Sequence, residues 1–242
     1  GQYPPNFQFS EVNASEQLTA DFQRVKLRLE RPEVFADDDA IHFRILLPEP
    51  ENTDPDYPIL LPNGSTKWPK GNKALHRPVY TARRMMGDIV DMDIFQHDGG
   101  RASDWARDVA PGTRLAIIGP GGGGLVDGGP VVLAGDETAY PAIARIMETL
   151  PDETAGHVIL LSHTGARDYP FPDCPNLNVD WTDKKDFVPA TRDALSATPE
   201  CHAWIAAERG QTGKITALEE LKAIPKTQRY VAGYWTSFKF EL

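Results

Sequence analysis

The sequence predicts two domains, an antiparallel β-barrel followed by a doubly wound parallel α/β sheet. From about residue 20 to 119, short β-like runs are separated by Pro, Gly, Asn and Asp, a pattern typical of antiparallel barrels and sandwiches. Beyond this region, continuous apolar runs alternate with helical stretches, which indicates buried parallel strands. We therefore expect domains at residues 1–122 and 123–242.

In the first half, one helix interrupts the strands. It is expected to begin at the N-cap Ser103, to present Trp105 and Ala106 to the core, and to stop at Pro111 and Gly112. Residues 48–73 contain six prolines and few apolar side chains, so they form a long surface excursion. The clearest strands are Val25–Leu29, Ile41–Leu47, Asp91–His97 and Arg114–Ile118.

Between the halves lies a glycine run at residues 119–124, interrupted only by Pro120. Because this run precedes a strand and does not join a strand to a helix, we interpret it as an interdomain turn in preference to a phosphate cradle. The second half then alternates strands and helices, with strands at Val131–Ala134, His157–Ser162, Leu177–Asp180, Ala203–Ala207 and Tyr230–Trp235, and helices over about 139–150, 186–197 and 214–224.

Composition narrows the class of protein. The 242 residues are 40% hydrophobic, no apolar run approaches the roughly 20 residues that span a bilayer, and no secretory signal is visible at the start. A net charge of −10 argues against nucleic acid as a partner. Two cysteines predict neither a disulfide framework nor a metal cluster, the six histidines lack ligand spacing, and residues 37–39, all Asp, are expected to form a solvated turn. We expect a cytoplasmic protein, a monomer or weak dimer, without membrane insertion or a protein metal site.

The most informative segment runs from Arg77 to Arg83. Along one extended strand, Tyr80 offers a ring for an aromatic ligand, Thr81 a hydroxyl, and Arg77 a guanidinium for a diphosphate. Such a set suits a flavin, although an ordinary barrel strand with two solvated arginines has the same composition.

A second segment leads from a half-buried strand into the predicted helix. Asp93 and His97 belong to the strand, and Gly99 and Gly100 precede the helix, where backbone N–H groups and the positive dipole end can receive a diphosphate. Taken alone, the glycines also fit a plain turn and His97 a structural hydrogen bond.

Together these segments resemble the siderophore-interacting family of FAD-dependent ferric-siderophore reductases. Residues 77–83 are similar to its Arg-x-Tyr-Thr-x-Arg flavin motif, and residues 93–106 to its strand–glycine–helix segment ending in Trp-Ala. Residues 133–143, which include Gly-Asp-Glu-Thr-Ala, are similar to its most distinctive signature. Pro111–Pro120, Trp204–Glu208 and Tyr234-Trp235 match further landmarks, so the resemblance covers about residues 41–236.

The resemblance implies a ferredoxin reductase-like fold, with an FAD-binding barrel and a domain like those that bind nicotinamide nucleotides. It implies FAD as cofactor, NADH or NADPH as electron donor and a ferric siderophore as substrate. The residues implied to bind FAD are Arg77, Tyr80 and Thr81 for the flavin and its phosphates, Asp93 and His97 near the nucleotide portion, and Gly100, Ala102 and Ser103 at the diphosphate.

In the second half, Asp136 and Thr138 follow the first strand, at the edge where ligands bind in such sheets. With Trp235 they are candidate cofactor-binding residues, and Thr138 is a candidate helix cap ahead of Pro141. A capped turn without a ligand is the alternative, because no Gly-x-Gly-x-x-Gly fingerprint is present.

One departure from the family concerns the end of the chain, where Trp235 is followed by Thr236 instead of a basic residue and a glycine. Candidates for attracting the ferric chelate are Arg83, Arg84 and Lys239, each of which is also compatible with an ordinary surface charge.

The expected reaction passes a hydride from the nicotinamide to the flavin and single electrons from the flavin to Fe(III), which requires no catalytic acid or base. Two alternatives are a general flavin oxidoreductase and a non-enzymatic protein that binds flavin or a ferric chelate.

Overall fold

A computed structural model describes residues 2–36, 38–124, 126 and 128–237. Their contacts divide the chain into two compact units, Gly1–Gly124 and Leu125–Leu242. Each unit has its own sheet and its own apolar core.

The first unit is a seven-stranded antiparallel sheet of order β6-β3-β9-β1-β2-β8-β7. The two edge strands of this sheet, β6 and β7, are connected by only two residues, Ala82 and Arg83. The sheet must therefore curl until its edges meet. The Arg83 N–H donates to the Asp91 carbonyl at 2.9 Å, which ties this corner to β8. The predicted barrel is therefore confirmed, with strands β1 (Phe7–Gln17), β2 (Phe22–Leu29), β3 (His42–Leu46), β6 (Val79–Thr81), β7 (Arg84–Met86), β8 (Ile89–Phe95) and β9 (Arg114–Gly121).

Alternation along the strands fills the barrel. On β8, Val90, Met92 and Ile94 point into the core, whereas Asp91 and Asp93 point to the other face. Helix α1 (Arg101–Asp108) contributes the buried Ala102 and Ala106 to the same core, and contacts β1, β2 and β8.

The excursion after β3 carries a two-stranded hairpin, β4 (Ile59–Leu60) and β5 (Thr66–Lys67), followed by the 3-10 turn η2 (Gly71–Lys73). Its Tyr57 and Trp68 pack on Phe7 and Phe9 of β1, which forms a small second core. A further 3-10 turn, η1, spans Pro32–Phe35.

The second unit is a five-stranded parallel sheet of order β12-β11-β10-β13-β14. Its strands are β10 (Val131–Gly135), β11 (Gly156–Leu161), β12 (Leu177–Thr182), β13 (His202–Glu208) and β14 (Arg229–Trp235). The connecting helices are α2 (Tyr140–Thr149), α3 (Phe187–Ala197), α4 (Arg209–Thr216) and α5 (Glu219–Lys222), with 3-10 turns η3 (Glu137–Ala139) and η4 (Lys226–Gln228).

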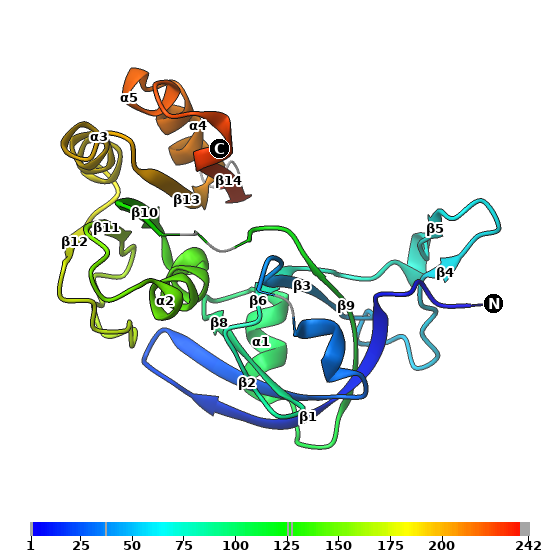
Figure 1. Ribbon diagram of the computed structural model, residues 1–242. Coiled ribbons are helices and arrows are strands. Elements are labelled where there is room, and N and C mark those ends of the chain that lie inside the picture. The colour runs from blue at the N-terminus through cyan, green and yellow to red at the C-terminus, as the bar shows by residue number, and fades with distance from the viewer. Residues whose placement is uncertain (1, 37, 125, 127, 238–242) are drawn as a thin grey trace. The chain divides into compact units, whose positions relative to one another are not determined.

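Helices cover both faces of this sheet (Figure 1). Val132 and Ala134 pack with α3, α4 and α5, whereas Gly135, on the opposite face, lies under Ile143 of α2. A Cβ at Gly135 would lie 2.6 Å from the Ala139 Cβ, so only glycine permits this close approach. The doubly wound arrangement predicted from the sequence is confirmed.

Several boundaries differ from the sequence predictions. Strand β1 was not predicted, because its outer half is mostly polar and exposed. The predicted helix over 214–224 is two helices, α4 and α5, since the chain becomes extended at Leu218, which packs on the core. Strand β9 continues through Pro120 to Gly121, so part of the glycine run belongs to the barrel.

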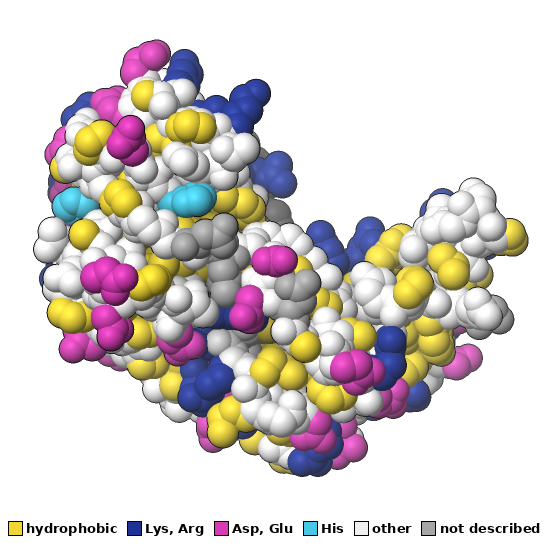
Figure 2. All heavy atoms as spheres, viewed as in Figure 1, with side chains coloured by type: hydrophobic (Ala, Val, Ile, Leu, Met, Phe, Trp, Pro, Cys, Tyr) yellow, Lys and Arg dark blue, Asp and Glu magenta, His cyan; other side chains and the backbone are white. Residues whose placement is uncertain are grey.

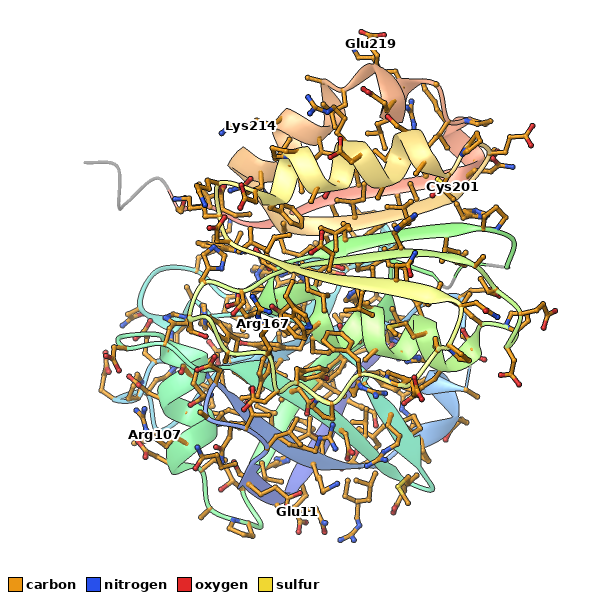
Figure 3. The ribbon with its side chains drawn as sticks, turned by 90° about the vertical axis from the view of Figure 1, so that its left-hand side faces the viewer. Glu11, Arg107, Arg167, Cys201, Lys214 and Glu219 are labelled. Carbon is orange, nitrogen blue, oxygen red and sulfur yellow. The ribbon has the colours of Figure 1, made fainter. Side chains whose placement is uncertain are left out.

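No helix within the described residues is long and apolar enough to cross a membrane. On the face shown in Figure 2, Asp and Glu side chains are spread among Lys and Arg side chains. Figure 3 shows Lys214 on α4 and Glu219 on α5 at the outer surface of the second unit.

Candidate functional site

The N-terminus of α1 is open to an anion. Its N-cap is Gly100, which has no side chain to cap the helix, and the first intrahelical bond is donated by Asp104 N–H at 2.9 Å. The N–H groups before Asp104 therefore have no intrahelical acceptor. Ser103 was expected to be the N-cap; instead it lies inside the first turn, because the chain already turns helical after Gly100.

His97 packs over this turn. A Cβ at Gly100 would lie 2.4 Å from the His97 ring, so the close approach requires glycine. The buried Ser103 hydroxyl accepts the His97 N–H at 3.0 Å, which fixes the loop between β8 and α1. His97, Gly100, Ala102 and Ser103 are therefore brought together around one helix end.

Strand β6 carries the flavin motif beside β3, with Tyr80 opposite Phe43 and Thr81 opposite His42. Tyr80 is partly buried against the barrel core, and burial raises the pKa of its phenol well above its usual range. Thr81 is buried. The strand thus offers a neutral aromatic ring and a hydroxyl at the edge of an apolar core.

Arg77 lies at the exposed start of this strand, with its guanidinium carbon 3.9 Å from the centre of the Trp68 ring. Its carbonyl accepts a hydrogen bond from Arg44. Trp68 was not predicted as a site residue, because it lies in a proline-rich excursion. An isolated Trp between Lys and Pro was the signal available in the sequence.

Asp93 is engaged within the protein. Its carboxylate accepts two hydrogen bonds from Arg24, at 2.7 and 2.9 Å, and its side chain is 0% exposed. The neighbouring Asp91 is paired with Lys26 and Arg84, each at 3.1 Å. These ion pairs give Asp93 a structural role in the barrel wall, which the sequence analysis did not foresee.

The three candidates for chelate binding differ in exposure. Arg83 is only 6% exposed, which leaves little of it accessible to a bulky ligand. Arg84 is about half exposed but its guanidinium is paired with Asp91. Lys239 lies outside the described residues.

In the second unit, Asp136 joins the ends of three strands. Its carboxylate accepts the Thr138 N–H and hydroxyl, the Glu208 N–H at 3.0 Å and the Trp235 indole N–H at 2.8 Å. Burial raises the pKa of Asp136, although these hydrogen bonds oppose the shift. The structure therefore unites Asp136, Thr138 and Trp235, with Asp136 as the cap of the 3-10 turn in place of Thr138.

Beside this group lies an ion pair that the sequence analysis did not identify. Glu137, 2% exposed, accepts the His163 backbone N–H and faces its Nδ1, both at 2.7 Å. The His163 ring also contacts the Trp235 ring edge-on, with centroids 5.8 Å apart. A Glu two residues after the first strand of this unit, and a His two residues after the second, were the signals available in the sequence.

The residues of the first unit fit FAD. An uncapped helix N-terminus suits a diphosphate, and the absence of a side chain at Gly100 leaves room for the His97 ring beside it. The neutral phenol of Tyr80 lies on β6, and the guanidinium of Arg77, two residues before β6, lies over the Trp68 ring.

Two family models match the chain. Residues 11–124 match the siderophore-interacting FAD-binding domain, and residues 130–237 match the siderophore-interacting protein. The NADPH-dependent ferric-chelate reductase of Escherichia coli strain K12 is 27% identical over 236 residues, which cover 91% of this chain and 89% of that protein.

Solved structures share the fold. A siderophore utilization protein from T. fusca has a TM-score of 0.80 at 24% identity, covering 98% of this chain and 95% of the other. The ferredoxin reductase in carbazole 1,9a-dioxygenase has a TM-score of 0.65 at 22% identity, covering 95% and 67%. The predicted ferredoxin reductase-like fold is confirmed by these similarities.

Proposed function

Because this chain belongs to the siderophore-interacting protein family, with FAD as the cofactor of its first domain, we propose that it is a ferric-siderophore reductase. The electron donor is NADH or NADPH, the acceptor is ferric iron chelated by a siderophore, and the product is Fe(II) for iron assimilation in the cytoplasm. The observation that carries the proposal is the match of residues 11–124 to an FAD-binding domain of siderophore-interacting proteins. The name of the E. coli relative, a ferric-chelate reductase, supports the same reaction.

The electrons balance with two ferric ions for each nucleotide. One NAD(P)H gives a hydride, which carries two electrons, and one proton is released as two Fe(III) become two Fe(II). Bound FAD supplies the conversion of a two-electron donor into single-electron transfers. Hard siderophore oxygens hold Fe(III) far better than Fe(II), so reduction loosens the metal.

The protein's task is to bind and orient the flavin in residues 1–122. Tyr80 and Thr81 would contact the isoalloxazine ring, and Arg77 would neutralise phosphate charge. The N-terminus of α1 would hold the diphosphate beside Gly100, through the backbone N–H groups of Ala102 and Ser103. His97 closes over that turn, and Asp93 supports the nucleotide portion from the barrel wall through Arg24.

Residues 123–242 receive the nicotinamide nucleotide at the carboxyl edge of the parallel sheet. Asp136 fixes the turn after β10 by its bonds to Thr138 and Trp235, so the three residues shape the edge together. The chelate is attracted by basic side chains, for which Arg84 and Lys239 are candidates. Arg83, being buried, contributes its charge from within the barrel. We expect a monomer or weak dimer.

The absorbance spectrum of the purified, FAD-loaded protein tests the proposal. Under anaerobic conditions, NADH or NADPH should bleach the flavin band, and a ferric siderophore should restore it with formation of Fe(II), detected by a colorimetric ferrous chelator. The steady-state turnover rate with a ferric siderophore as acceptor is then compared with the rate with free flavin as acceptor.

Two outcomes contradict the proposal. Faster turnover with free flavin than with ferric chelates would indicate a general flavin oxidoreductase. A flavin that neither nucleotide bleaches, in a protein that binds ferric chelate tightly, would indicate a non-enzymatic binding protein.

A further inference from the structure

The second unit places a histidine and a lysine at two neighbouring strand ends. Strands β11 and β12 are paired in parallel, with Leu161 opposite Thr182, so the residues that follow them emerge side by side. His163 follows β11 and Lys184 follows β12. In open parallel sheets, ligands bind outside the carboxyl ends of the strands, and a cation there accommodates the 2′-phosphate of NADP.

Lys184 is close enough to His163 for its charge to lower the pKa of the imidazole. No ion-pair partner of Lys184 is found among the residues that the structure describes. The adjacent Lys185 differs, because its ammonium contacts Asp183 at 2.8 Å and Asp186 at 3.3 Å. Of two consecutive lysines, one is therefore neutralised and the other is available to a ligand.

Asp183, the acidic residue next to Lys184, already accepts several hydrogen bonds. Asp183 accepts the backbone N–H groups of Lys185 and Asp186, in addition to the Lys185 ammonium. A carboxylate that accepts from a ribose 2′-hydroxyl is the feature that favours NADH. The Asp183 carboxylate is already held by the turn that precedes α3.

Glu137 determines how His163 presents its ring. A carboxylate only accepts hydrogen bonds, so the Nδ1 atom, 2.7 Å from Glu137 Oε1, must carry a proton. Nε2 is then the atom left to face a ligand, and it becomes a donor when the ring is protonated. The edge-on contact with Trp235 holds the ring in place.

We propose that His163 and Lys184 bind the 2′-phosphate of NADPH, so that this chain uses NADPH in preference to NADH. This inference rests on the proposed function for its nucleotide donor. Glu137 is a positioning residue that orients the imidazole. The charged groups that face His163 are Glu137 and Asp136, which favour its protonated form, and Lys184, which opposes it.

Calorimetric titration of the FAD-loaded full chain with 2′,5′-ADP and with 5′-AMP isolates the 2′-phosphate. We expect 2′,5′-ADP to bind the unmodified chain at least 10-fold more tightly, because charge-assisted hydrogen bonds contribute about that much each. His163→Gln and Lys184→Gln should each weaken 2′,5′-ADP binding about 10-fold and leave 5′-AMP binding unchanged. The same variants should raise KM for NADPH and not for NADH.

Matched controls exist on the same elements. Lys185→Gln removes an adjacent, paired lysine, and His157→Gln removes a histidine at the amino end of β11; both should leave the preference for 2′,5′-ADP intact. Raising the pH should weaken 2′,5′-ADP binding more in the unmodified chain than in His163→Gln, since only the former loses an imidazolium.

Equal affinities for the two fragments in the unmodified chain would overturn the inference, as would an equal loss in Lys184→Gln and Lys185→Gln. If His163→Gln does not fold, the inference is still tested by Lys184→Gln, a change at an exposed residue, and by the affinities of the unmodified chain for 2′,5′-ADP and 5′-AMP. Failure of the proposed function is distinct: 2′,5′-ADP would bind selectively, yet neither nucleotide would bleach the flavin.

Discussion

Replacing Arg24 by Met should destabilise the barrel strongly, because Arg24 holds a buried carboxylate. The Asp93 side chain is 0% exposed and receives two hydrogen bonds from the Arg24 guanidinium. Removing one partner of a buried ion pair leaves an uncompensated charge, which costs about 3–5 kcal/mol. Asp91 is affected less, since Lys26 and Arg84 still pair with it.

The matched control lies on the same strand. Arg28 pairs with Asp88 at 3.5 Å, and both side chains are about half exposed. Exposed pairs contribute about 0–1 kcal/mol, so Arg28→Met should change the free energy of unfolding by no more than that. The double variant Arg24→Met/Asp93→Leu should recover most of the stability, because apolar replacement of a buried pair is often neutral.

Hydrogen exchange followed by mass spectrometry measures the effect in each unit separately. Peptides from β2 and β8 should lose about 100-fold or more in protection in Arg24→Met, since about 1.4 kcal/mol corresponds to a factor of ten. Peptides from the second unit's sheet should not change. Equal losses in Arg24→Met and Arg28→Met, or a double variant as unstable as Arg24→Met, would refute the reasoning.

Three further predictions concern the turns and the second unit. Gly100→Ala should force the His97 ring aside and weaken FAD binding about 10-fold or more in a fluorescence titration, an outcome contradicted by unchanged affinity. Gly135→Ala should destabilise the second unit by about 1–3 kcal/mol through overpacking, seen as faster exchange in β10 and disproved by wild-type protection. Because its hydrogen bond to Glu137 raises the pKa of His163 above 6.5, that pair stabilises the folded state below pH 6.5 and loses its effect as pH rises through the higher folded value. Urea unfolding across this range should show the decline, and His163→Gln should abolish it; an unchanged slope in the variant would contradict the assignment.

The fold could be predicted to the level of its two sheets because periodicity reports burial. Strand β10 is apolar at every position and buried throughout, as a parallel strand between two layers of helices must be. Strand β1 was not predicted because its regularity depends on pairing with β2 and β9, and its register with β2 shifts between Val12 and Ala14. Local pattern carries no information about such long-range pairing.

The sequence was sufficient to predict many of the residues of the candidate site, but not the residues with which they form hydrogen bonds and ion pairs. Asp136 and Thr138 lie in one family signature and Trp235 in a separate landmark, yet only the folded chain shows that Thr138 and Trp235 both donate to the Asp136 carboxylate. The ion pair of Asp93 could not be predicted from the sequence. Its partner Arg24 lies in β2, 69 positions away, and no local pattern around Asp93 indicates that pairing. His163 was not predicted as a site residue, because the histidines were considered only as metal ligands and lacked the spacing for that role. In the structure its ring pairs with Glu137, a buried glutamate in the turn after β10.

The bond between Asp136 and Trp235 also constrains how the second unit comes together. The two residues are 99 positions apart, and the Glu208 N–H that shares the same carboxylate is 72 positions away. During synthesis, β10, α2 and β11 can pair long before Trp235 has been made, but their carboxyl edge then ends in a buried acid without its indole donor. Closing so long a loop is slow relative to helix formation. The carboxyl edge of this sheet therefore gains the last hydrogen bond of Asp136 only when β14 has docked.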